Sequence, residues 1–349
     1  MQEVCHAELA CYNRGHADEI VGPSRQTASL EWTEWVGMIL VTGGTGFIGR
    51  ALIRHLSEAG HRVRTLIRPS QRSPRLPTGV PVDVVVASLD DARSLRAAMV
   101  GVKTVYHLAG VERRGGTADL LPVEVQGTRN VLAAAQDARV DRFFYTSHLG
   151  ADRASAFPLL KAKAIAEEHI RRSGLDYTIF RTALVFGPND GFTSGLAQLL
   201  YALPFIFLIP GDGDNLVQPL WIEDLTTCLA WALDDEDTRK RTFEIGGPEF
   251  LTLKEVVKIV MKRVGVERTL VQASQPWMRA LTVLVEYVLP ASPVSVYWLD
   301  YLSTNRTCSL DTIPRVFNLM PSRFSHRLDY LSGQNWRRVL WRSILRPNR

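Results

Sequence analysis

Cysteine is scarce in this chain of 349 residues, which contains four, Cys5, Cys11, Cys228 and Cys308. Their spacing fits no metal-binding pattern, and they are too few for a disulfide framework. We therefore expect no structural metal and a reducing compartment. Long apolar runs are also lacking: no uninterrupted run reaches the roughly 18 residues that a membrane-spanning helix needs.

Residues 1–37 lack apolar periodicity and show no apolar core of a signal peptide. They hold six acidic and two basic side chains, so the rest of the chain is more basic than the formal charge of +5 suggests. We expect a disordered extension here, or a true translation start at Met38, where the first strand is predicted. Without a sign of export, the sequence indicates a cytoplasmic protein.

Basic residues gather near the C-terminus, where Arg323 to Arg349 include seven arginines and one acid. Apolar residues are interleaved with the arginines at helical spacing over 332–349, which predicts a basic amphipathic helix. Such a helix could bind an anionic membrane surface on the inner face of the membrane, or a membrane protein complex. It could equally pack its tryptophans on its own domain. No nucleic-acid-binding module accompanies the charge, so nucleic acid is not an expected partner.

Residues 38–49 form a short apolar run that leads into three glycines, followed by a helical pattern and a second strand at 63–67. Glycines at this spacing let the strand turn sharply, let backbone N–H groups approach a pyrophosphate and let the helix pack closely. Strand, turn, helix and strand in this order predict a dinucleotide-binding site. The expected binding residues of the turn are Gly43, Thr45, Gly46, Phe47, Ile48 and Gly49.

Strands and helices alternate as far as residue 182, which predicts an α/β fold with a doubly wound parallel Rossmann sheet. Further strands are expected at 82–86, 102–108, 142–147 and 177–182, and helices from 91 and over 123–138 and 162–172. Ligands of such sheets bind at the carboxyl ends of the strands. This edge adds Leu108, Ala109 and Gly110 to the predicted cofactor-binding residues.

The domain prediction is a Rossmann domain over 38–188 and a smaller, mixed C-terminal lobe over 189–331 for a substrate or partner. Some strands of this lobe are expected to return to the sheet. A capping box at Thr252 and Glu255 predicts a helix start within it. The apolar segments 199–210 and 280–290 are expected to be core or interface segments.

Arg68 determines the predicted choice of dinucleotide. It follows the last glycine by about 20 residues, where an NAD-selective site usually has an acid for the ribose hydroxyls. Arg64 and Arg72 lie nearby in the sequence, and no acid occurs between residues 62 and 82. An arginine can bind a 2′-phosphate with two hydrogen bonds, so NADP(H) is favoured, with NAD(H) as the alternative.

The chain resembles the atypical branch of the short-chain dehydrogenase/reductase superfamily. Within it, the chain is similar to the group that contains the nucleotide-binding accessory subunit of respiratory complex I and its bacterial relatives. The resemblance covers residues 38 to about 331 and rests, besides the glycine turn, on the blocks 105–110, 127–131, 145–152, 163–168, 181–188, 218–224 and 246–248.

This resemblance implies a catalytic serine, tyrosine and lysine, the last two four residues apart on one helix face. Ser147 fits the serine and Lys163 the lysine, and both would also bind cofactor. Leu159 stands at the tyrosine position and cannot transfer a proton. His148 is a conceivable substitute, although a loop histidine bonded to backbone is the simpler interpretation.

Three functions follow from the resemblance and from the missing tyrosine. The first is an NADP(H)-binding protein with a structural or sensing function near a membrane respiratory or quinone-related complex. The second is an NAD(P)H-dependent oxidoreductase or epimerase with a non-standard proton donor, acting on a small hydrophobic carbonyl, quinone or sugar-nucleotide substrate. The third is an assembly factor of the kind found among photosystem and respiratory members of the superfamily.

Overall fold

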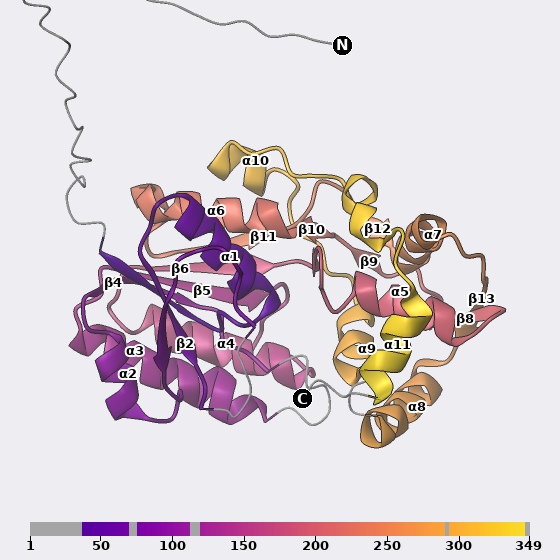
Figure 1. The fold of residues 1–349 in the computed structure, drawn as a ribbon, viewed down its shortest axis with the longest axis horizontal. Helices are drawn as coiled ribbons and strands as arrows, with labels where there is room; N and C mark the ends of the chain where they lie inside the picture. Colours follow the sequence, from indigo (N-terminus) through magenta and orange to yellow (C-terminus); the bar gives the residue numbers. More distant parts are fainter. Residues whose placement is uncertain (1–36, 70–74, 112–118, 290–292, 346–349) are drawn as a thin grey trace, which may run out of the picture. The chain divides into compact units, whose positions relative to one another are not determined.

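The computed structural model describes residues 37–69, 75–111, 119–289 and 293–345. Seven strands form its central parallel sheet in the order β11-β6-β5-β4-β1-β2-β3 (Figure 1). The strand order reverses between β1 and β4, as in doubly wound sheets. The predicted α/β Rossmann class is therefore confirmed. The strands are β1 (Met38–Thr42), β2 (Val63–Ile67), β3 (Asp83–Val86), β4 (Val102–His107), β5 (Arg142–His148), β6 (Tyr177–Thr182) and β11 (Arg241–Ile245).

Helices cover both faces of this sheet (Figure 1). On one face, α1 (Phe47–Glu58) packs on α6 (Ile222–Asp234). On the other lie α2 (Ala92–Ala98), α3 (Thr128–Asp137) and α4 (Pro158–Arg171). In α1 the buried residues Leu52, Ile53 and Leu56 recur at helical spacing, which explains why this segment forms a helix on the sheet.

Two helix starts differ from the sequence prediction. The segment expected as one helix over 123–138 begins as a π-helix, η2 (Leu121–Gly127), before α3. Helix α4 begins at Pro158 rather than near 162. Proline is tolerated in the first helical turn because no intrahelical partner awaits its missing N–H.

Many of the short strands and helices beyond residue 184 pack around a separate apolar core. The predicted capping box is confirmed: Glu255 N donates to Thr252 Oγ1 at 3.2 Å, and Thr252 N donates to Glu255 Oε2 at 2.8 Å. The elements are β7 (Val185–Phe186), α5 (Thr193–Ala202), β8 (Ile206–Pro210), β9 (Leu216–Val217), β10 (Leu220–Trp221), η3 (Glu236–Thr238), β12 (Leu251–Thr252), α7 (Leu253–Val264), β13 (Thr269–Ala273), α8 (Gln275–Val288), α9 (Val296–Leu302), α10 (Thr312–Phe317), η4 (Phe324–Arg327), η5 (Asp329–Leu331) and α11 (Trp336–Leu345).

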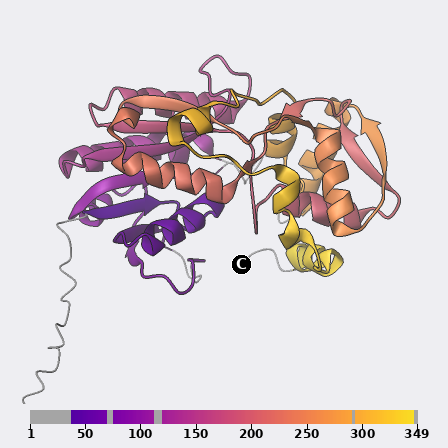
Figure 2. The ribbon, with the colours of Figure 1, turned by 90° about the horizontal axis from the view of Figure 1, so that it is seen from above.

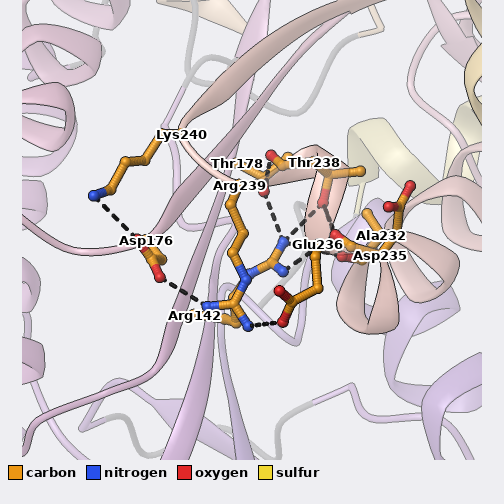
Figure 3. Close-up of polar contacts among 9 residues, drawn as sticks. All are labelled: Arg142, Asp176, Thr178, Ala232, Asp235, Glu236, Thr238, Arg239 and Lys240. Carbon is orange, nitrogen blue, oxygen red and sulfur yellow. Dashed lines mark hydrogen bonds and ion pairs between the residues drawn. The ribbon is translucent and has the colours of Figure 1, made fainter.

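A buried arginine ties this later part of the chain to the amino ends of the strands (Figure 3). Arg142 Nη2 donates to Thr178 Oγ1 at 3.0 Å, to Thr238 Oγ1 at 2.8 Å and to Ala232 O at 3.0 Å. Burial lowers the pKa of Arg142. Neutral acceptors thus hold the terminal nitrogens of a charged donor, although its Nε has no partner among the described residues, and they fix the connection that precedes β11.

Helix α8 exposes most of its apolar residues. Thr282 is its one buried residue, whereas Trp277 is 54% and Tyr287 86% exposed. Of the two predicted uses of segment 280–290, core or interface, this exposure excludes the core for most of residues 280–288, and the interface stays a prediction. Across the described parts of the chain, no helix is long and apolar enough to cross a membrane.

Helix α11, drawn in yellow, packs on α5 (Figures 1 and 2). Trp336 is buried and donates its indole N–H to Leu331 O at 2.9 Å, while Trp341 is 58% exposed. Arg337, Arg338 and Arg342 are also exposed. One side of the helix thus packs on its own domain, and the other side exposes its arginines to solvent, so both predicted uses of the helix remain possible. The predicted extension over 1–37 lies outside the described residues, except for Gly37.

Candidate functional site

The turn after β1 has a geometry that only glycine allows at two positions. Gly43 has φ of +72°, and a Cβ there would lie 2.6 Å from the backbone of Leu108. A Cβ on Gly49 would lie 2.3 Å from Gly43 O. Gly46 N donates to Gly43 O at 2.9 Å, which closes the turn. The glycines therefore bring the backbones of β1, α1 and the end of β4 into contact.

The amino end of α1 opens onto this turn. Gly46 caps the helix without a side-chain hydrogen bond, and its first turn holds no acidic residue. Phe47, Ile48 and Gly49, the first helical residues, line a cavity. Backbone N–H groups and the helix dipole favour an anion at such a site.

Two cavities flank the turn and share Gly43, Gly46, Leu108 and Gly110. The β2-side cavity, of about 400 Å³, continues to the carboxyl ends of β2 and β3 and includes Thr45, Arg68 and Ala109. The β6-side cavity, of about 190 Å³, continues past α1 to the carboxyl ends of β5 and β6. A bare glycine backbone between two adjoining cavities fits an extended dinucleotide, whose pyrophosphate would lie at the turn.

Arg68 is exposed in the β2-side cavity. Arg64 serves elsewhere: its Nε donates to Asp83 Oδ2 at 2.7 Å, and its Nη1 to two backbone carbonyls near the end of α2. Arg72 lies outside the described residues. Ser88 and Asp90 line the same cavity and were missed by the sequence reasoning. Both residues follow the predicted strand 82–86 at the ligand-binding edge of the sheet, so their positions in the sequence could have identified them as lining residues.

Lys163 points to a buried carboxylate. Its Nζ lies 2.9 Å from Glu124 Oε2, and both side chains are almost wholly buried. Glu124 Oε1 accepts a hydrogen bond from Val111 N at 3.0 Å. Neither cavity beside the turn includes Ser147, Lys163 or the half-buried Leu159 among its lining residues. The cofactor and catalytic roles of Ser147 and Lys163 therefore stay predictions.

Three side chains near Lys163 are buried in the sheet. The hydroxyl of Ser147 has no hydrogen-bond partner among the described residues. Tyr145 stacks on His107 with ring centroids 5.7 Å apart, and burial raises its pKa. Burial, helped by the charge of Lys163, lowers the pKa of His107 to about 3. Tyr145 is thus a core residue, as its strand position predicts.

His148 lines the β6-side cavity beside aromatic residues of α9. Its ring centroid lies 6.2 Å from that of Tyr297 and 6.4 Å from that of Tyr301. Trp298 lines this cavity too. Nothing in the sequence indicated that α9, about 150 residues further along the chain, would meet the end of β5, because no local pattern encodes that contact.

A third, apolar cavity of about 220 Å³ adjoins the C-terminal lobe's helices. No charged side chain is among its lining residues, and Trp298 lines it as well as the β6-side cavity. It is lined from α5 by Gly195, Leu196 and Leu199, from α8 by Met278, Leu281, Thr282 and Val285, and from α9 by Trp298, Leu299 and Leu302. Within the described residues, no group of histidine, cysteine and acidic residues could hold a metal ion.

Residues 43–194 match the family model described as NAD(P)H-binding. The chain is 27% identical over 281 residues to an NADH dehydrogenase [ubiquinone] 1 alpha subcomplex subunit 9 of Arabidopsis thaliana, covering 77% of this chain and 70% of that protein. These matches confirm the resemblance to the atypical short-chain dehydrogenase/reductase proteins and to the complex I accessory subunit group.

Two further relatives carry other names. Photosystem II assembly factor Ycf39 of Cyanophora paradoxa is 29% identical over 227 residues, which are 65% of this chain and 63% of that protein. A ceramide reductase of Caulobacter vibrioides is 26% identical over 323 residues, 87% of this chain and 97% of that protein.

Solved structures share the fold. An epimerase from Methanothermobacter thermautotrophicus superposes with a TM-score of 0.66 at 20% identity, covering 88% of this chain and 94% of that one. At this identity the similarity establishes the architecture alone. Dinucleotide binding therefore rests on the family match together with the geometry of the glycine turn.

Proposed function

We propose that the chain is an NADPH-dependent reductase of a hydrophobic carbonyl compound, because residues 43–194 match the NAD(P)H-binding family model. The observation that carries this proposal is Trp298, which lines both the β6-side cavity and the apolar cavity. A ligand could therefore place a polar carbonyl group beside the cofactor and its apolar part among the side chains of α5 and α8.

Arg68 supports NADP(H) as the dinucleotide. It lines the β2-side cavity at the end of β2, where the ribose of the adenosine would lie. Asp90 lines the same cavity, so the site also contains a carboxylate. We favour NADP(H), because Arg68 follows the strand whose end contacts the ribose in this fold, and a 2′-phosphate gives its guanidinium two charge-assisted hydrogen bonds.

The apolar cavity favours a long-chain or ring-containing lipid-like substrate over a sugar nucleotide. Its lining offers only the hydroxyls of Thr282 and Ser295 to a ligand's polar groups, besides the Trp298 indole and the backbone. Sugar hydroxyls buried there would lose hydrogen bonds to water without replacement. One relative, which this chain matches over 97% of that protein's length, is named a ceramide reductase, and this name agrees with a lipid-like substrate.

Gly195 offers a direct test, since it lines the apolar cavity on α5 and a Cβ there would meet only ordinary contacts, 3.5 Å from Pro293. Purified protein would be mixed with NADPH and a panel of long-chain aldehydes and ketones, quinones and sugar nucleotides, and cofactor oxidation followed. We expect Gly195→Leu to abolish turnover of the chain-bearing substrates, Gly195→Ala to keep most of it, and NADPH affinity to be equal in both.

Turnover of a sugar nucleotide alone, or of chain-bearing substrates at the same rate in Gly195→Leu, would contradict the assignment of the apolar cavity to the substrate. Thermal unfolding of each variant controls for stability. Leucine also replaces glycine within a helix, which favours folding locally.

A second candidate is a non-catalytic NADP(H)-binding subunit or assembly factor of a membrane complex. It is supported by Leu159 at the proton-donor position and by Lys163 held on Glu124. The names of the complex I subunit and photosystem assembly factor relatives agree with it. Tight NADPH binding with no turnover of any carbonyl, together with recovery in a solubilised membrane complex, would select this candidate over the reductase.

We also propose a peripheral location on the inner face of a membrane. The exposed apolar face of α8 and the exposed arginines of α11 support it. Helix α8 is also a wall of the apolar cavity, so a substrate drawn from the bilayer would meet the cavity at this helix.

A further inference from the structure

Three side chains that can donate a proton line the β6-side cavity. Leu159 offers no acidic group, and Lys163 is 2.9 Å from Glu124. A reductase still needs a proton for the carbonyl oxygen. The protonatable side chains that line the cavity are His148, Tyr297 and Tyr301.

Tyr301 differs from its neighbours in how its hydroxyl is satisfied. Its side chain is 4% exposed, and its Oη has no hydrogen-bond partner among the described residues. Tyr297 is half-buried by comparison. A buried hydroxyl without a partner is rare in folded proteins and marks a place where a ligand or water supplies the bond.

Arg306 supplies a positive charge beside this tyrosine. Its guanidinium carbon lies 4.9 Å from the centre of the Tyr301 ring, its Nε donates to Tyr301 O at 3.0 Å, and its Nη1 donates to Leu149 O at 2.9 Å. The guanidinium is buried, and no ion pair joins it to a carboxylate within the described segments. The nearby Asp300 carboxylate acts on Arg306 electrostatically but forms its ion pair with Arg279.

Burial raises the pKa of Tyr301, and Arg306 opposes that rise by favouring the phenolate. In the related enzymes, the lysine beside the catalytic tyrosine has this effect. Arg306 also joins α9 to the loop after β5, because Leu149 follows His148. The tyrosine, the arginine and the histidine thus form one group at the carboxyl end of the sheet.

We propose that Tyr301 is the proton donor of the reaction, an inference that rests on the reductase function proposed above. Bound NADPH supplies the hydride to the carbonyl carbon. Tyr301 Oη donates its proton to the carbonyl oxygen, so the C=O double bond becomes a C–OH bond and the products are an alcohol and NADP⁺. The phenolate left on Tyr301 is stabilised by Arg306 and regains a proton from solvent through His148, whose ring lies 6.4 Å from its own.

The test compares Tyr301→Phe, Tyr297→Phe and Tyr177→Phe in the full-length protein, with a long-chain ketone and the alkane of equal length as probes. Tyr177 lies at the opposite end of β6 and is the matched control. For Tyr301→Phe we expect ketone reduction to fall about 100- to 10,000-fold, the usual contribution of a proton-transfer group. NADPH affinity is expected to stay unchanged, since phenylalanine keeps the ring that packs on Arg306.

Equilibrium binding gives a readout independent of turnover. Tyr301→Phe should weaken binding of the ketone about three- to tenfold, the usual range for one hydrogen bond, and leave binding of the alkane unchanged. If wild-type protein reduces the ketone and Tyr301→Phe does so equally fast, or if Tyr297→Phe loses more, Tyr301 is not the donor although the reductase stands. If wild-type protein neither reduces nor binds the ketone, the reductase function itself fails, and this inference with it.

Discussion

At the level of single residues, the proposed function rests on two side chains. Arg68 lines the β2-side cavity, and Trp298 lines both the β6-side cavity and the apolar cavity. The first could be predicted from the sequence because a strand end at fixed distance from the glycines contacts the ribose in this fold. The second could not, since α9 reaches the site only through the packing of the C-terminal lobe.

The exposed guanidinium of Arg68 gives a prediction on cofactor choice. Arg68→Asp should weaken NADPH binding about 10- to 100-fold, since hydrogen bonds to charged groups contribute about 1.5–3 kcal/mol, and should change NADH binding much less. Nucleotide fluorescence titration measures both affinities. Arg54→Asp, an exposed charge reversal on α1, is the control for general electrostatics. Equal losses for the two nucleotides would show that Arg68 does not bind a 2′-phosphate.

At the scale of elements, the ion pair between Glu124 and Lys163 joins η2 to α4 beneath the carboxyl end of the sheet. The sequence located the lysine on its helix correctly, because helical spacing and the resemblance agreed there. Its partner was not predictable: Glu124 lies 39 residues earlier, in a segment whose π-helical turn leaves no simple periodic pattern. The lysine that the resemblance assigns to ribose binding is therefore held here in a buried ion pair.

This pair predicts a large effect on stability. Glu124→Leu should lower the free energy of unfolding by about 3–5 kcal/mol, because it leaves the Lys163 charge buried without its carboxylate. Glu124→Leu combined with Lys163→Met should recover most of the loss, since no charge is then buried. Urea denaturation measures both. A double variant as unstable as the single one would show that the cost comes from packing rather than from the unpaired charge.

At the scale of the whole molecule, the described chain brings together three cavities, an exposed apolar helix and an exposed set of arginines. The sheet and its cofactor edge could be predicted, because alternating strands and helices and the glycine turn are local signals. The apolar cavity and the open face of α8 could not, because they depend on which side of each helix the lobe covers. Segment 280–290 shows this: its apolar content predicted a core or an interface, and α8 leaves most of its apolar residues up to Val288 exposed.

Vesicle binding follows from these exposed faces. We expect the protein to sediment with vesicles that contain anionic phospholipid and to bind purely zwitterionic vesicles more weakly, as expected for arginines near a membrane surface. Replacing Trp277 and Tyr287 together with serine should reduce binding to both, and replacing Arg338 and Arg342 with glutamine only to the anionic ones. Binding that neither pair of changes affects would exclude α8 and α11 as the membrane-contacting helices.

The proposed function requires that a dinucleotide and an apolar ligand occupy adjoining cavities of one molecule. Native mass spectrometry of the protein purified from its own cells, followed by identification of the released small molecules, tests it directly. We predict that NADP(H) and a lipid-like molecule are released from the wild-type protein, and that Gly195→Leu retains the nucleotide and loses the lipid-like molecule. Release of NAD(H) would contradict the choice of NADP(H), and equal retention of an apolar molecule in Gly195→Leu would contradict the assignment of the apolar cavity.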